Sequence, residues 1–150
     1  MKDLKHIKDM NIRKIVIITL TLFMAHSLAK SENLLENDIL ETQNIIESQI
    51  KAFLDEDAEK AFSYAAPIIK LKFNNPEQFM TMVKNYYEPV YNPKHYYFVD
   101  SQYFEGSIYH QLQVISQSNI SYLATYSLIR ENEEWKISGC AVYPMTQESI

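Results

Sequence analysis

The change of hydrophobic period after Pro93 is the feature that most constrains the fold, because the spacing of apolar residues shifts there from 3.6 to 2. Four alternating segments follow: His95–Phe104, Ser107–Gln117, Ile120–Arg130 and Glu134–Tyr143. Only two or three residues separate neighbouring segments. Such short connections join antiparallel strands, since a parallel pair needs a crossover of about a dozen residues or more. The second half of the chain is therefore predicted to be an antiparallel meander.

The two faces of this sheet are both partly apolar. In the second segment one face carries Ile108, His110, Leu112 and Val114, and the other carries Tyr109, Gln111, Gln113 and Ile115. The third segment has the same mixed character, with one face that carries Ile120, Tyr122, Ala124, Tyr126 and Leu128. We expect one face to pack on helices and the other to be partly covered by a ligand or a partner.

Helical patterns occupy the region before Pro93. Apolar residues recur at helical spacing from Leu35 to Phe53, and Asp55 or Asp57 can cap a second helix that Pro67 ends or restarts. Asn75 and Pro76 mark the start of a further helix, which should end before Pro89. The predicted fold class is α+β, with N-terminal helices packed on an antiparallel sheet. The pattern alone does not choose between a cone and a cystatin-like sheet wrapped around one helix.

Residues 1–29 resemble a signal peptide. Five basic residues precede an apolar run of 11 residues, Ile15 to Ala25, and Ser27-Leu28-Ala29 offers small residues for cleavage before Lys30. A spanning helix needs about 20 apolar residues. We expect an exported protein, periplasmic or secreted, with residues 30–150 as its single domain and no stable membrane span after cleavage. The alternatives are an uncleaved short anchor or a helix of the domain, and Met10 is an alternative start.

The overall charge argues against a nucleic-acid partner. The chain has 14 basic and 19 acidic residues, a formal charge of −5. Residues 1–29 hold five basic and two acidic ones, so the remaining 121 residues carry 9 basic and 17 acidic ones, a charge of −8. The two glycines, Gly106 and Gly139, are far apart, which excludes glycine-rich phosphate loops. No metal-ligand spacing occurs, so neither a metal nor a cofactor is expected.

A set of ordered residues resembles the bacterial family catalogued as domain of unknown function 4864 (DUF4864). They lie between about Ile45 and Val142 and comprise Gln49, Phe53, Asp57, Ala58, Ala61, Phe62, Ala65, Pro67, Phe73, Phe79, Met82, Val83, Tyr87, Pro89, Val90, Tyr91, Pro93, Trp135, Ile137, Gly139 and Cys140. The resemblance implies an NTF2-like, SnoaL-like domain in which helices and a strongly curved sheet form an open cone. It implies no activity, because such cones host isomerases, dehydratases, transport factors and binding modules.

The tyrosines favour a binding role over catalysis. The chain has 11 of them, and a tyrosine offers a large apolar area with a polar tip, although strands also favour it. We expect a small apolar or amphipathic ligand, or a protein of the cell envelope, to bind at Tyr87, Tyr91, Tyr122 and Tyr126. The alternatives are a homodimeric interaction module and a small isomerase or dehydratase-like enzyme. Its acid–base candidates would be His110 and Asp100. The single cysteine, Cys140, is expected to be a small buried hydrophobe.

Overall fold

The computed structural model describes residues 35–145, so the predicted signal peptide at 1–29 lies outside the described residues. The chain divides into two units, Met1–Asp38 and Ile39–Ile150. Of the first unit only residues 35–38 are described, and they form helix. The fold set out below is that of the second unit.

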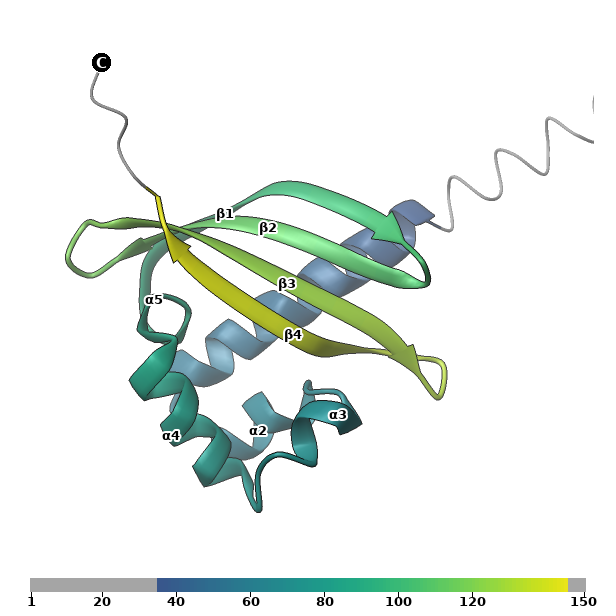
Figure 1. The fold of residues 1–150 in the computed structure, drawn as a ribbon, viewed down its shortest axis with the longest axis horizontal. Helices are drawn as coiled ribbons and strands as arrows, with labels where there is room; N and C mark the ends of the chain where they lie inside the picture. The colour runs from purple at the N-terminus through teal and green to yellow at the C-terminus, as the bar shows by residue number, and fades with distance from the viewer. Residues whose placement is uncertain (1–34, 146–150) are drawn as a thin grey trace, which may run out of the picture. The chain divides into compact units, whose positions relative to one another are not determined.

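Five helices lie before the sheet in the described part of the chain (Figure 1). They are a long helix that covers residues 35–54, α2 (Ala58–Ser63), α3 (Pro67–Lys70), α4 (Pro76–Tyr86) and α5 (Glu88–Tyr91). The Asp57 side chain accepts a hydrogen bond from the Lys60 backbone N–H at 3.0 Å, and Asn75 accepts one from Gln78 at 2.9 Å. Of the two candidates for the first cap, Asp57 is the one that caps α2, and the predicted Asn75 cap is confirmed. Each satisfies a backbone donor that the first helical turn leaves unpaired.

The segment around Pro89 differs from its predicted form. The sequence patterns assigned no helix to the residues between Tyr87 and Pro93, but Glu88–Tyr91 forms the one-turn helix α5. Pro89 lies in the first turn of α5, where its missing N–H would have no intrahelical partner in any case. Helix α4 still ends before Pro89, as predicted, and α5 then directs the chain into the sheet at Pro93.

Four strands form one antiparallel sheet in the order β1-β2-β3-β4. They are β1 (Pro93–Phe104), β2 (Ser107–Ser116), β3 (Ser121–Glu131) and β4 (Glu134–Pro144). The meander and its segment boundaries are confirmed to within about two residues. Both residues of the Glu105-Gly106 turn have positive φ, 49° and 80°, and those of the Asn132-Glu133 turn have 50° and 70°. Two positive φ angles match the right-handed twist of the flanking strands.

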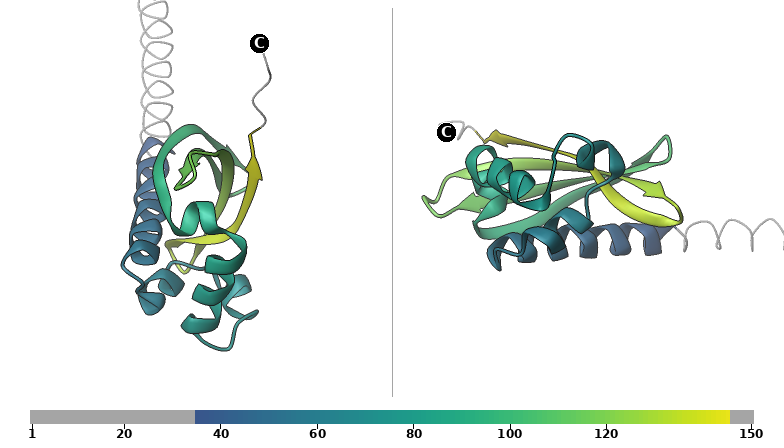
Figure 2. Two further views of the ribbon diagram at one scale, coloured as in Figure 1. Left: turned by 90° about the vertical axis from the view of Figure 1, so that its left-hand side faces the viewer. Right: turned by 90° about the horizontal axis from the view of Figure 1, so that it is seen from below.

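The sheet has three irregularities of pairing: one at the start of β1, between Pro93 and His95, and two within the body of the sheet. Pairing shifts between Phe98 and Asp100 on β1, and again where Ser127 pairs with Gly139 but Leu128 pairs with Ile137. The second shift leaves Ser138 as an extra residue on β4, and extra residues of this kind increase local twist and bend a strand. Figure 2 shows the resulting curved sheet, with helices on its inner side. This α+β arrangement agrees with the cone that the family resemblance implied.

The core consists of two clusters. The sheet cluster joins the long helix and α5 to the inner sheet face: Ile46, Ile50, Val90, Ile108, Leu112, Val114, Ala124, Tyr126, Leu128, Trp135 and Ile137. The helix cluster lies among the helices: Ala52, Phe53, Ala61, Phe79, Met80, Val83 and Tyr91. The buried residues of β2 and β3 share one of the two faces that the alternating pattern separated, the face that carries Ile108 on β2 and Tyr126 on β3. The core is thus divided between a sheet side and a helix side.

The segment between α2 and α3 connects these two sides. Ala65 forms a parallel bridge with Ile137 on the edge strand β4. The Ile137 N–H donates to the Tyr64 carbonyl at 2.8 Å, and the Ala66 N–H donates to the Ile137 carbonyl at 2.8 Å. This bridge occupies part of an edge that would otherwise present unpaired backbone groups.

Within residues 35–145, none of the helices combines the length and the apolar character that crossing a membrane requires.

Replacing Leu112 with alanine tests the sheet cluster. Leu112 is fully buried, so Leu112→Ala should lower the free energy of unfolding by about 2–5 kcal/mol through lost burial and a residual cavity. Leu71→Ala is the matched control, because Leu71 is 87% exposed and its replacement should change stability by about 0.5 kcal/mol or less. Urea unfolding measures both. Equal losses in the two variants would contradict the placement of Leu112.

Candidate functional site

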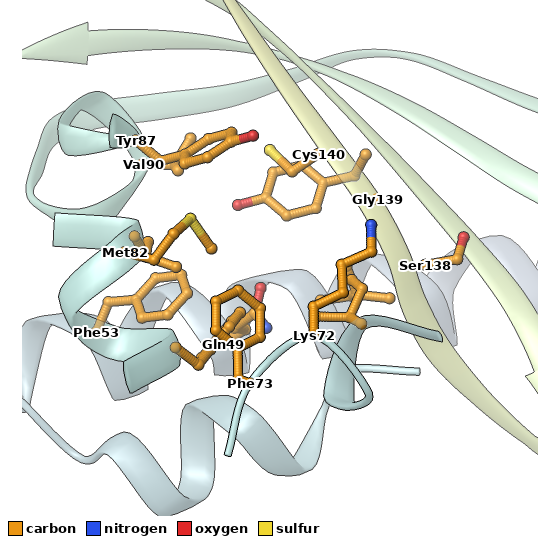
Figure 3. A pocket seen from close by; sticks show the side chains of 15 residues that line it. Gln49, Phe53, Lys72, Phe73, Met82, Tyr87, Val90, Ser138, Gly139 and Cys140 are labelled. Atoms are coloured by element: carbon orange, nitrogen blue, oxygen red, sulfur yellow. The ribbon is translucent and has the colours of Figure 1, made fainter. Parts of the chain in front are cut away.

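A pocket of about 300 Å³ lies at the boundary of the two clusters. The helix cluster contributes Phe53, Phe79 and Val83 to its wall, and the sheet cluster contributes Val90, Tyr126 and Ile137. Figure 3 shows how the labelled lining residues surround the space, with Ser138, Gly139 and Cys140 on one strand and the helical residues opposite. The pocket therefore exists where sheet and helices do not pack directly on each other.

Tyr126 is a deeply buried polar residue in the wall of this pocket. It is 1% exposed, yet its hydroxyl has no hydrogen-bond partner of good geometry among the described residues. Burial, followed by the neighbouring Cys140 thiol, raises its pKa well above the ordinary value, so the hydroxyl keeps its proton. A thiol is only a weak hydrogen-bonding group. Burying an unpaired hydroxyl costs about 1–3 kcal/mol, which makes Tyr126 an exception among buried polar groups.

Cys140 lies across from Tyr126 in the β3–β4 register and lines the same pocket. Burial raises the pKa of its thiol to about 12, while the hydrogen-bonding influence of Tyr126 acts in the opposite direction. Since the thiolate is the nucleophilic form, Cys140 is an unreactive wall residue at neutral pH. This agrees with the interpretation of Cys140 as a small hydrophobe.

The strand wall is shaped by a close approach between β3 and β4. A Cβ on Gly139 would lie 2.9 Å from the Ser127 Oγ, so a side chain at this position would require the Ser127 hydroxyl to move. The Ser138 hydroxyl donates to the Ser127 carbonyl at 3.1 Å, and the Ser127 hydroxyl then donates to Ser138 Oγ at 2.9 Å. These bonds hold the irregular stretch of β4 that faces the pocket.

Two further polar side chains line the pocket. Gln49, from the long helix, is 3% exposed and donates from Nε2 to the Ala61 carbonyl at 3.1 Å, which fixes its amide between two helices. Lys72, after α3, is exposed and is the one charged residue among the described residues that line the pocket. In Figure 3 the Lys72 side chain extends toward β4 near Gly139.

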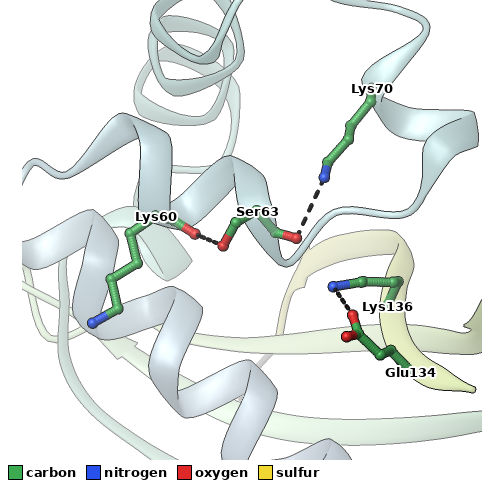
Figure 4. Close-up of polar contacts among 5 residues, drawn as sticks. All are labelled: Lys60, Ser63, Lys70, Glu134 and Lys136. Atoms are coloured by element: carbon green, nitrogen blue, oxygen red, sulfur yellow. Dashed lines mark hydrogen bonds and ion pairs between the residues drawn. The ribbon is translucent and has the colours of Figure 1, made fainter.

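The lysines nearest to this wall have other partners. Lys70 Nζ donates to the Ser63 carbonyl at 3.4 Å and lies 5.6 Å from the centre of the Phe62 ring. Lys136 pairs with Glu134 at 2.7 Å, and this hydrogen bond and charge lower the Glu134 pKa. Figure 4 shows both contacts. Lys70 and Lys136 thus have partners of their own and do not line the pocket, whereas Lys72 does.

The four predicted ligand-binding tyrosines separate into two pairs. Tyr87 and Tyr126 line the pocket, from the junction of α4 with α5 and from β3. Tyr91 packs in the helix cluster, 6.0 Å from Phe53 between ring centres, and Tyr122 packs against the sheet cluster. Neither Tyr91 nor Tyr122 lines the pocket. Of the four tyrosines, Tyr87 and Tyr126 are therefore the two that a molecule in the pocket could contact.

His110, one of the two acid–base candidates, lies outside the pocket in a hydrogen-bonded chain. Its Nε2 is 2.8 Å from Thr42 Oγ1, and its Nδ1 is 2.7 Å from Ser101 Oγ. Thr42 gives its own proton to the Ile39 carbonyl at 2.9 Å, so Nε2 must carry the ring proton and Ser101 donates to Nδ1. Gln43 donates in turn to Ser101 Oγ at 3.4 Å. His110 is fully buried, and burial lowers its pKa to about 4.

Asp100, the other candidate, lies on β1 and is exposed. It accepts a hydrogen bond from the Gln102 side chain at 2.8 Å and pairs with Gln111 across the sheet. In this register Asp100 shares the outer face with Gln111, whereas Ser101 and His110 share the inner one. The structure therefore does not bring the two acid–base candidates together.

Sequence reasoning did not identify Gln49 or Lys72 as site residues. Gln49 lies in the buried stripe of the long helix, beside Ile46 and Ile50. A polar residue within an apolar stripe was the sequence feature that could have identified it. Lys72 has no local signal, because only the path of the chain after α3 brings it to β4. The serine pair and the close approach at Gly139 also depend on a pairing shift that alternation does not reveal.

The comparisons with known proteins add a family match and distant structural likenesses. The model of the family described as Domain of unknown function (DUF4864) matches residues 35–150. None of the curated proteins matches the chain. Solved structures that are similar include a variant of a protein named Rd1NTF2_05, at 14% identity and a TM-score of 0.49, over 72% of this chain and 99% of that one.

Two natural proteins are similar at the same level. Bd1075 of Bdellovibrio bacteriovorus has 15% identity and a TM-score of 0.48, over 73% of this chain and 41% of its own. A protein of Kribbella flavida has 8% identity and a TM-score of 0.44, over 68% of this chain and 84% of its own. At these scores the likenesses say nothing about a ligand or an activity.

The buried state of His110 predicts a pH dependence of stability. Above about pH 6.5 its ring is neutral in both the folded and the unfolded chain. As pH falls from about 6.5 toward 4, the unfolded chain takes up a proton that the folded chain resists, so this residue lowers the free energy of unfolding. His110→Gln, which has no titrating ring, should lose less stability between pH 7.5 and 4.5 than the wild type in urea unfolding. Equal losses in both proteins would contradict a buried neutral His110.

Proposed function

We propose that this chain, which belongs to the family described as Domain of unknown function (DUF4864), binds a small, mainly apolar molecule with a polar group in the pocket between sheet and helices. The observation that carries the proposal is the Tyr126 hydroxyl, which is buried and protonated at the pocket wall and, among the described residues, has no hydrogen-bond partner of good geometry, with only the weakly bonding Cys140 thiol beside it. A ligand that accepts a hydrogen bond from this hydroxyl would recover the interaction that the protein itself leaves unmade.

The size and chemistry of the pocket support the same proposal. Ligand pockets are mostly apolar with a few convergent polar groups and span roughly 300–1,000 Å³, so a volume of about 300 Å³ is at the small end. At about 30 Å³ for each water in the liquid, the space corresponds to roughly ten non-hydrogen atoms. Phe53, Phe79 and Met82 supply apolar surface, and Tyr126 and Gln49 supply hydrogen-bonding groups.

The residue types that line the pocket favour binding over acid–base catalysis. Among the described residues that line the pocket there is no aspartate, glutamate or histidine. The Cys140 thiol has a pKa raised to about 12 and the Tyr126 phenol a pKa raised well above its ordinary value, so neither is poised to exchange a proton near neutral pH. His110 has both ring nitrogens engaged elsewhere.

Tyr126→Phe separates a binding role from a structural one. Removing an unpaired buried hydroxyl should leave the free energy of unfolding unchanged or raise it by about 1 kcal/mol. The same change should weaken binding of 1-octanol, used as a small probe with one hydroxyl, by about two- to tenfold. Urea unfolding and isothermal titration calorimetry give the two numbers.

Tyr122→Phe is the matched control, because Tyr122 lies on the same strand but does not line the pocket. It should leave the affinity for 1-octanol unchanged. The proposal fails if 1-octanol does not bind the wild type, or if Tyr126→Phe destabilises the protein without changing affinity.

We also propose that the domain works after export, as a periplasmic or secreted protein. The support is the order of basic, apolar and small residues in 1–29. The intact mass of the protein isolated from the envelope or medium should correspond to a chain that begins at Lys30. Ala29→Lys should block cleavage and leave a heavier, membrane-associated precursor. A full-length wild-type mass would contradict this proposal and leave the binding proposal untouched.

A further inference from the structure

We infer that the ligand carries a negative charge, so that its anionic group lies at Lys72 and its apolar body fills the pocket between the two clusters. The inference rests on the proposed binding function and specifies its ligand class as a small amphipathic carboxylate. Its basis is the juxtaposition of one exposed cation with an apolar space whose remaining described lining is uncharged.

Lys72 is available for such a contact. Within residues 35–145, no ion pair or side-chain hydrogen bond involves its ammonium group, whereas Lys70 and Lys136 are engaged with Ser63 and Glu134. Its backbone N–H donates to the Ile69 carbonyl at 2.9 Å, which anchors the residue directly after α3. The backbone of Lys72 is therefore anchored, and no carboxylate within residues 35–145 forms an ion pair with its ammonium group.

The local charge decides the sign of the ligand although the domain is acidic overall. Residues 30–150 carry a formal charge of −8, which would repel an anion at long range. At physiological ionic strength the screening length is about 8 Å, so exposed charges elsewhere on the surface act weakly at the pocket. Among the described lining residues only Lys72 is charged, and it disfavours a cationic ligand.

The pocket volume bounds the length of the ligand, and Lys72 and Tyr126 indicate the polarity of its ends. An anionic end at Lys72 and a hydrogen-bond acceptor at Tyr126 are compatible with a chain of roughly ten non-hydrogen atoms, the number that a volume of about 300 Å³ holds. The matched probes are then 8-hydroxyoctanoate and octane-1,8-diol. Both carry a distal hydroxyl, and they differ in the carboxylate.

Isothermal titration calorimetry of the full folded domain with both probes tests the inference. The wild type should bind 8-hydroxyoctanoate at least threefold more tightly than the diol at low salt, and 0.5 M NaCl should reduce this ratio. Lys72→Met, which keeps the length of the side chain and removes its charge, should bring the ratio close to one. It should leave the affinity for the diol at the wild-type value, which also shows that the variant is folded.

Lys60→Met is the matched control. It removes one positive charge from α2, and Lys60 does not line the pocket, so the ratio of the two affinities should persist. Equal affinities of the two probes on the wild type, or an equal collapse of the ratio in Lys60→Met, would overturn the anionic ligand while the binding proposal stands. Absence of binding by either probe would overturn both.

Discussion

The backbone bridge between residues 64–66 and Ile137 is the constraint on which the rest of the site depends. Its two hydrogen bonds attach the segment that joins α2 to α3 to the edge strand β4. The helix cluster is thereby held beside the sheet at a separation that backbone atoms fix. Side chains alone would be free to collapse into the gap, because apolar surfaces gain by contact. With the backbone attached on one side and α5 connecting the other, the space near Tyr126 stays open.

The bend of β4 is the second determinant of the pocket wall. The two glycines of the chain have different roles, and only Gly139 belongs to this bend. Gly106 occupies a turn position with φ of 80°, a conformation that favours glycine. Gly139 has no such backbone requirement, but its missing side chain lets the Ser127 hydroxyl approach. The extra residue Ser138 and the serine hydrogen bonds then stabilise the irregular pairing. A regular strand here would present a flat wall to the helices.

Local patterns predicted most of the fold, while the site depended on information that local patterns lack. The alternation after Pro93 predicted all four strands, and the caps at Asp57 and Asn75 predicted two helix starts, because each signal acts within a few residues. The one-turn helix α5 was missed because Pro89, within its first turn, and Pro93, two residues after its end, favour an extended connector equally well.

The pocket was predicted only in part, since it is assembled from elements distant in sequence. Residue type selected all four tyrosines alike, but only Tyr87 and Tyr126 line the pocket, whereas Tyr91 and Tyr122 pack in or against the two clusters. The buried face that carries His110 followed from alternation, but its partners Thr42 and Ser101 come from the long helix and from β1. Such partners emerge only when the register between a helix and a sheet is known.

The hydrogen-bonded chain around His110 also determines where the long helix lies along the sheet. A purely apolar contact between Ile46, Ile50 and β2 would tolerate sliding, because hydrophobic attraction has no preferred direction. Displacing the helix by one turn, about 5.4 Å, would part Thr42 from the imidazole and leave buried polar groups unpaired. The buried histidine thus selects one alignment of the long helix on the sheet. Apolar packing alone would leave several such alignments nearly equal in energy.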